Sequence, residues 1–125
     1  MNSYKDIKEI IIIDDEEHWI DKIKDKILRE YPLYIIRCFN DFKNFKQFDS
    51  IENAEIIITD FYFSGYNLDQ IDNKFNDFKG KVILVTGYPN AVSNIDDYSR
   101  IINKANINKP TFKFSRYFWT LLIEN

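Results

Sequence analysis

The stretch Glu9-Ile10-Ile11-Ile12-Ile13-Asp14-Asp15 decides how the rest of the chain folds. Its consecutive isoleucines show no polar alternation, which is typical of a strand that is buried on both faces of a sheet. In the next segment, residues 16–30, apolar side chains recur every three or four positions, as they do on one face of a helix. The chain therefore begins with a buried strand that leads into an amphipathic helix, and two carboxylates stand at their junction.

The segments that follow continue this alternation of strand and helix. Further strands are predicted at residues 34–39, 55–59 and 82–85, with one more close to the lysines at 104 and 109. Further helices are predicted at residues 41–49, at 68–78 and from residue 90 onward. Such alternation implies right-handed crossovers and a parallel sheet with helices on both faces. We therefore expect an α/β fold of the doubly wound kind.

Composition and charge narrow the class of protein. The 125 residues suit a single domain, expected to span 1–125. A net charge of −3 argues against a protein that grips nucleic acid. The single cysteine, Cys38, excludes an internal disulfide and is expected to be a buried apolar residue of the second strand. No secretion signal and no apolar run near the roughly 18 residues of a membrane helix is visible, so a cytoplasmic protein with no membrane contact is expected.

Polar residues follow the predicted strands at the points where the strands end. Asp14 and Asp15 follow the first strand, Asp60 follows the third, and Thr86 ends the fourth. In parallel sheets the ligand site lies beyond the carboxyl ends of the strands. Carboxylates that meet there repel one another unless a cation joins them, and Mg²⁺ or Mn²⁺ is the natural partner. One carboxylate could then act as a nucleophile toward phosphorus, with a hydroxyl and a lysine contacting the phosphoryl group.

Four motifs in register resemble the receiver domain of two-component response regulators. They are Asp14-Asp15-Glu16, Thr59-Asp60, Thr86-Gly87 and an Asn-Lys near the C-terminus, each preceded by apolar residues. The resemblance covers essentially the whole chain. It implies a flavodoxin-like (βα)5 three-layer sandwich with a five-stranded parallel sheet in the order 2-1-3-4-5.

The resemblance also implies a role for individual residues. Asp60 is expected to be the phosphoacceptor, and Thr86 the switch hydroxyl that moves toward the phosphoryl group. The metal, Mg²⁺ with Mn²⁺ as the alternative, is expected to be held by Asp14, Asp15 and Asp60 and by the backbone carbonyl of Tyr62. Ordinary readings stay open beside these roles: Asp14 could be the N-cap of the first helix, and Asp60 and Thr86 could be plain strand-end residues.

Two lysines compete for the position that contacts the phosphoryl group. Lys104 follows an apolar pair in a good strand but lacks the proline that usually follows, whereas Lys109 precedes Pro110 but lies in a poor strand. We favour Lys104, with Lys109 as the alternative, because only Lys104 ends a strand that can be buried. Pro110 would then fall near the first turn of the last helix, where proline is favoured.

The chain departs from the receiver pattern at three places. Ser64 stands where proline is usual, and Leu68 stands where glycine is usual. Three residues before the lysine, where receivers carry a tyrosine or phenylalanine, this chain has Ile101, or Asn106 if the lysine is Lys109. The usual aromatic readout of phosphorylation is therefore expected to be absent.

The leading hypothesis is a stand-alone response regulator receiver, a signalling protein that is not an enzyme. It would accept a phosphoryl group on Asp60 from a histidine kinase or phosphotransfer protein in a phosphorelay and would signal through an unidentified protein partner. A homodimer is compatible with the resemblance. The alternative is a pseudo-receiver, an interaction module that phosphorylation does not regulate. An aspartyl-phosphate hydrolase is disfavoured because Tyr62 stands where its second aspartate would be.

Overall fold

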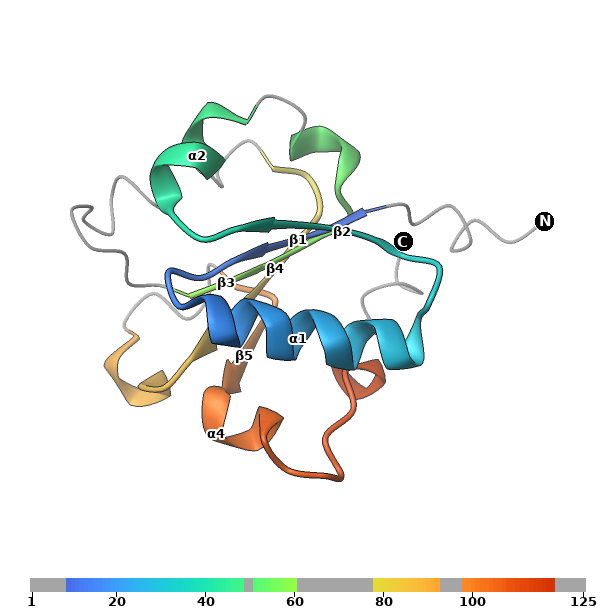
Figure 1. Cartoon of the computed structure of the whole chain (residues 1–125). Coiled ribbons are helices and arrows are strands. Elements are labelled where there is room, and N and C mark those ends of the chain that lie inside the picture. The colour runs from blue at the N-terminus through green and yellow to red at the C-terminus, as the bar shows by residue number, and fades with distance from the viewer. Residues whose placement is uncertain (1–8, 49–50, 61–77, 93–97, 119–125) are drawn as a thin grey trace.

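A computed structural model describes residues 9–48, 51–60, 78–92 and 98–118 (Figure 1). The strands are β1 (Glu9–Ile13), β2 (Ile35–Phe39), β3 (Ile56–Thr59), β4 (Lys81–Thr86) and β5 (Arg100–Asn103). They form a five-stranded parallel sheet in the order β2-β1-β3-β4-β5. The predicted fold class and strand order are therefore confirmed, the first four strands lie within about a residue of their predicted bounds, and the fifth ends directly before Lys104.

Helices follow the first, second and last strands. These are α1 (Glu17–Glu30), α2 (Phe42–Gln47) and α4 (Lys104–Ile107), with two short 3₁₀ turns, η2 (Ile51–Asn53) and η3 (Pro89–Ala91). Residues 115–118 are also helical. The helix predicted at 68–78 and most of the one predicted from residue 90 lie outside the described residues. In the described part of the chain, no helix is long and apolar enough to cross a membrane.

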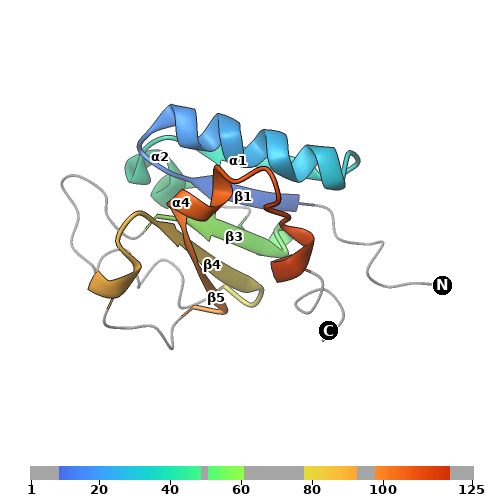
Figure 2. The same cartoon turned by 90° about the horizontal axis from the view of Figure 1, so that it is seen from below.

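The sheet has a helical layer on each face (Figures 1 and 2). Ile10 and Ile12 point to the face that carries α1 and the C-terminal residues, where they share a core cluster with Phe118. Ile11 and Ile13 point to the face that carries α2, where they pack with Phe45. All of these isoleucines are 0–1% exposed. Burial on both faces therefore explains why the first strand shows no polar alternation.

The second strand corrects one expectation from the sequence. Cys38 is exposed rather than buried. β2 lies at one edge of the sheet, and Ile35 on the same strand is also 52% exposed. A helix that covers the middle of a sheet leaves parts of an edge strand uncovered, so an apolar run alone does not reveal burial there.

The C-terminal helical residues are joined to α1 by a carboxylate. The backbone N–H groups of Phe114 and Ser115 donate to the two carboxylate oxygens of Glu30, at 2.6 and 3.1 Å. Glu30 is the last residue of α1, and the N–H groups belong to the start of the helical residues 115–118. A carboxylate at a helix N-terminus satisfies N–H groups that have no partner inside the helix. Pro110, expected in the first turn of this helix, instead lies several residues before it.

We predict that Glu30→Gln lowers the free energy of unfolding by about 1–2 kcal/mol, because a carboxamide has one accepting oxygen and no charge. Urea denaturation followed by circular dichroism measures the change. Asp25→Asn is the matched control, since Asp25 pairs with Arg29 on the exposed side of α1 and should contribute less than about 0.5 kcal/mol. Equal effects of the two variants would contradict a capping role for Glu30.

Candidate functional site

The first site residue, Asp14, is a buried carboxylate in the turn between β1 and α1. Its side chain is 2% exposed. One oxygen accepts the backbone N–H of Glu16 at 2.9 Å, and the other lies 2.9 Å from the ammonium of Lys104. The N-cap position of α1 is held by Glu16, so the reading of Asp14 as the helix cap is wrong. One oxygen instead holds the turn after β1 through the Glu16 N–H, and the other pairs with Lys104.

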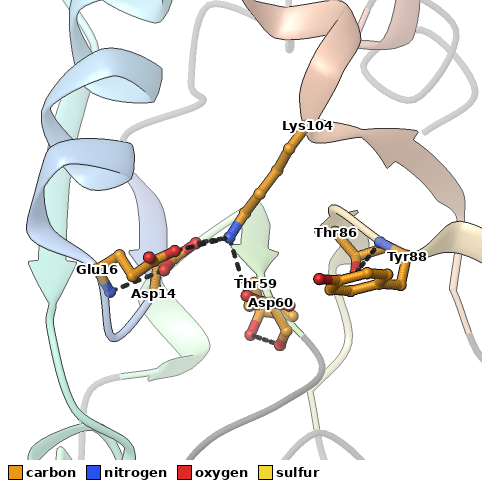
Figure 3. A network of polar contacts seen from close by, with 7 residues as sticks. All are labelled: Asp14, Glu16, Thr59, Asp60, Thr86, Tyr88 and Lys104. Carbon is orange, nitrogen blue, oxygen red and sulfur yellow. Dashed lines mark hydrogen bonds and ion pairs between the residues drawn. The ribbon is translucent and has the colours of Figure 1, made fainter.

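Lys104 connects the ends of β1 and β3 (Figure 3). It is the first residue of α4, directly after β5, and its side chain reaches back to the sheet edge. Its Nζ donates to Asp60 Oδ2 at 2.9 Å and lies 3.9 Å from a carboxylate oxygen of Glu16. Lys109 is exposed on the segment after α4. Of the two candidate lysines, the structure therefore brings Lys104 to Asp60.

Burial and the neighbouring charges shift the pKa values of this cluster in opposite directions. Burial raises the pKa of Asp14, against the hydrogen bonds from Lys104 and from the Glu16 amide, which favour the charged form. Burial alone would lower the pKa of Lys104, but the Asp14 and Asp60 carboxylates together raise it above its ordinary value of 10.5. The ammonium is therefore charged at neutral pH and offsets one of the two negative charges of the carboxylates between which it lies.

The acidic residues also meet the requirements of a cation site. Asp14, Asp15 and Asp60 each offer a carboxylate oxygen, and these oxygens lie within 4.8 Å of one another. Asp14 is buried, Asp60 is half-buried and Asp15 is exposed, so the cluster opens to solvent on one side. Hard oxygen donors of this number and charge fit Mg²⁺ or Mn²⁺, which keep several waters. Tyr62, whose carbonyl was expected to complete the site, lies outside the described residues.

Two hydroxyl groups lie at the ends of the adjacent strands β3 and β4. Thr86, the last residue of β4, is 1% exposed, and its Oγ1 accepts the backbone N–H of Tyr88 at 3.1 Å. Thr59 donates its hydroxyl to the backbone carbonyl of Asp60 at 2.7 Å. The Thr86 hydroxyl therefore holds the start of the turn after β4, and the Thr59 hydroxyl bonds the backbone of Asp60 itself (Figure 3).

Sequence reasoning did not predict the contact of Trp19 with Lys104, and it did not consider Tyr88. Tyr88 follows Thr86 by two residues and is 76% exposed. The Trp19 ring centroid lies 5.2 Å from Lys104 Nζ. Helical spacing assigned Trp19 to the core stripe of α1, and it does pack partly against that core. Its place in the first turn of α1, four residues after Asp15, was the signal that could have indicated its second contact.

We predict that Asp15→Asn weakens Mg²⁺ binding by on the order of tenfold, because it removes one charged oxygen donor from the site. Isothermal titration calorimetry on the unphosphorylated protein measures the affinity. Glu17→Gln is the control, since Glu17 lies in the first turn of α1 and outside the acidic cluster. An unchanged affinity in Asp15→Asn would remove Asp15 from the set of ligands.

Comparisons with known proteins agree with this architecture at the level of structure. No family model matches the sequence, and a search of the curated proteins finds no significant match. Among solved structures, the chain is similar to a CheY-like receiver domain protein from Methanospirillum hungatei, with 20% identity, a TM-score of 0.70, and coverage of 94% of this chain and 95% of that one.

Two further structures are similar and carry ligands or a modification. One is a response regulator from Thermotoga maritima in complex with Mg²⁺ and BeF, with 18% identity, a TM-score of 0.66, and coverage of 93% and 99% of the two chains. The other is a response regulator from Burkholderia pseudomallei with a phosphorylated aspartic acid and a calcium ion, with 18% identity, a TM-score of 0.62, and coverage of 92% and 66%. The chain therefore has the fold of response regulator receiver domains.

Proposed function

We propose that this chain is a response regulator receiver that accepts a phosphoryl group on Asp60 in two-component signalling. The observation that carries the proposal is the position of the Lys104 ammonium, 2.9 Å from carboxylate oxygens of both Asp14 and Asp60. A half-buried acceptor carboxylate, a fixed cation beside it and two further carboxylates at the same sheet edge are the parts that phosphoryl transfer requires.

The reaction follows from the chemistry of these groups. An Asp60 carboxylate oxygen attacks the phosphorus of a phosphohistidine on a histidine kinase or phosphotransfer protein. The phosphorus–oxygen bond forms as the phosphorus–nitrogen bond breaks, and the imidazole leaves with the electron pair of the broken bond. Mg²⁺ bound by Asp14, Asp15 and Asp60 would neutralise the phosphoryl oxygens. Lys104 then pairs with a phosphoryl oxygen, and the Thr86 hydroxyl can donate to another.

The output is proposed to be a change in affinity for a protein partner rather than catalysis of a reaction by this chain. A partner surface, a homodimer and a cytoplasmic location are parts of the same proposal. Ile101 lies on β5 and packs against the core cluster on the α2 face. An aliphatic side chain at this position cannot supply the aromatic rotation expected of a receiver, so the signal must pass through other residues near Thr86.

A second candidate function is a pseudo-receiver, an interaction module that is independent of phosphorylation. One observation favours it: Lys104 pairs with both Asp14 and Asp60, so each of these acidic side chains has a cationic partner without a metal ion. Such a site could be retained for stability only. The absence of the aromatic at Ile101 points in the same direction.

Intact-mass spectrometry separates the two functions. The protein is incubated with acetyl phosphate, with and without Mg²⁺, and its mass is followed over time. A receiver gains the mass of one phosphoryl group in a reaction that depends on Mg²⁺ and reverses under conditions that hydrolyse acyl phosphates. An unchanged mass under all conditions would support the interaction module and overturn the receiver proposal.

A further inference from the structure

The ring of Trp19 forms one wall of the space that Lys104 occupies. Lys104 Nζ lies 5.2 Å from the ring centroid, which is within the range of a cation–π contact. Lys104 is 6% exposed, and Trp19 is half-buried against the core. Cation–π attraction is strongest when the cation is shielded from water. The ring is therefore a further attractive group for this ammonium, besides the carboxylates of Asp14, Asp60 and Glu16.

The ring differs from the two carboxylates in one respect that matters for the site. A metal ion bound by Asp14 and Asp60 would compete with Lys104 for the negative charge of these two carboxylates. Trp19 offers no ligand to a hard cation, so its attraction for the ammonium does not compete with the metal. With Asp14 and Asp60 engaged by a metal, two contacts would remain available to Lys104: the buried face of the ring and the exposed Glu16 carboxylate, 3.9 Å away.

We propose that Trp19 is a positioning residue that keeps the Lys104 ammonium at the reaction centre when the carboxylates bind a metal ion. This inference rests on the proposed function, since the purpose of the positioning is contact with the phosphoryl group. Trp19 is not a catalytic residue, because it contacts Lys104 and not the reacting atoms.

A second lysine lies on the same ring and provides a matched control. Lys22 Nζ lies 5.0 Å from the Trp19 centroid and donates to the side-chain oxygen of Asn108 on the segment after α4. Lys22 therefore has a cation–π contact like that of Lys104 but a hydrogen-bond partner away from the acidic cluster. Its removal should change the surroundings of the ring without changing the reaction.

The first experiment tests the contact without any phosphorylation. The full chain labelled with 5-fluorotryptophan gives one ¹⁹F resonance for each of its two tryptophans, and Trp19→Phe identifies that of Trp19. Lys104→Met and Lys22→Met should each shift this resonance, whereas Lys109→Met should not. A resonance that does not respond to Lys104→Met would overturn the proposal, whatever the protein does with phosphate.

The second experiment tests the positioning role through binding of beryllofluoride with Mg²⁺. Trp19→Leu should weaken beryllofluoride binding about threefold to tenfold, the range expected for one shielded cation–π contact, while Mg²⁺ affinity changes less than about twofold. Trp19→Phe should weaken beryllofluoride binding less than Trp19→Leu does. It serves as the test variant if Trp19→Leu does not fold. His18→Leu and Lys22→Met, which also alter contacts of the ring, should leave binding unchanged.

The decisive comparison uses the Lys104→Met background. There Trp19→Leu should cause no further loss of beryllofluoride binding, because the group that Trp19 positions is gone. The same loss in both backgrounds would show a merely structural role and overturn the proposal. Failure of the wild-type protein to bind beryllofluoride would instead overturn the proposed function, and the ¹⁹F shifts would still decide the contact.

Discussion

Asp60→Asn is expected to abolish phosphoryl transfer to this chain, with a fall in rate of at least on the order of a hundredfold. A carboxamide lacks the anionic oxygen that attacks phosphorus and cannot form an acyl phosphate. The substitution preserves the shape of the side chain, and its oxygen can still accept from Lys104, which now donates to Asp60 at 2.9 Å. The fold should therefore remain intact, and the effect should be confined to chemistry.

Intact-mass analysis after acetyl phosphate and Mg²⁺ treatment measures the Asp60→Asn effect, with circular dichroism as the check on folding. Asp15→Asn is the control, because Asp15 belongs to the same acidic cluster but is not expected to carry the phosphoryl group. It should react slowly but to completion at high Mg²⁺. Undiminished phosphorylation of Asp60→Asn would place the acceptor at another residue, which peptide mapping would locate.

Lys104→Met is expected to destabilise the protein by about 3 kcal/mol at neutral pH in the absence of divalent cations. The substitution keeps the length of the side chain but leaves the Asp14 carboxylate, 2% exposed, without its counter-charge and facing Asp60. Mg²⁺ should restore part of the loss, since a cation that binds only the folded state stabilises it. Urea denaturation with EDTA and with Mg²⁺ measures both effects.

The pH dependence of stability gives an independent check on the same substitution. Because the pKa of Lys104 is raised above 10.5 in the fold, its stabilisation is complete below 10.5 and is lost as the pH rises through the higher folded value. Lys104→Met should lack this alkaline loss. Burial raises the pKa of Asp14 above 3.8, so protonation of Asp14 favours the fold and the variant should recover stability as the pH falls toward that value.

Lys109→Met is the matched control for both measurements, because Lys109 is exposed and should change stability by less than about 0.5 kcal/mol. A Lys104→Met protein as stable as wild type in EDTA at neutral pH would contradict the account of Lys104 as the counter-charge of the buried Asp14. Equal effects of the two substitutions would contradict it as well.

The sequence by itself determined the sheet and the edge at which the chemistry lies. Apolar runs such as Ile10–Ile13 specify strands that must be buried on both faces, and their alternation with helical stripes leaves a doubly wound parallel sheet. In such a sheet all the carboxyl ends of the strands share one edge. Asp14, Asp60 and Thr86 were therefore expected at that shared edge, where the ends of β1, β3 and β4 place them.

The choice between Lys104 and Lys109 depended partly on the sequence and partly on the tertiary structure. Sequence favoured Lys104 because it follows a strand that can be buried, and the structure brings its ammonium to Asp60. The local geometry was not anticipated: β5 ends at Asn103, whose side chain accepts the N–H of Ala105, and Lys104 opens the short helix α4. A helical start directs the lysine side chain back over the sheet edge.

Only the tertiary structure decided the contacts that give the site its electrostatics. The pairing of Lys104 with Asp14, the ring of Trp19 over the ammonium and the exposure of Cys38 each depend on elements that are distant in sequence. The capping of Phe114 and Ser115 by Glu30 spans more than 80 residues. Periodicity reports which face of an element is apolar, because that property is local. Which charged or aromatic side chains meet depends on strand order, edge position and helix length, and these are properties of the assembled layers.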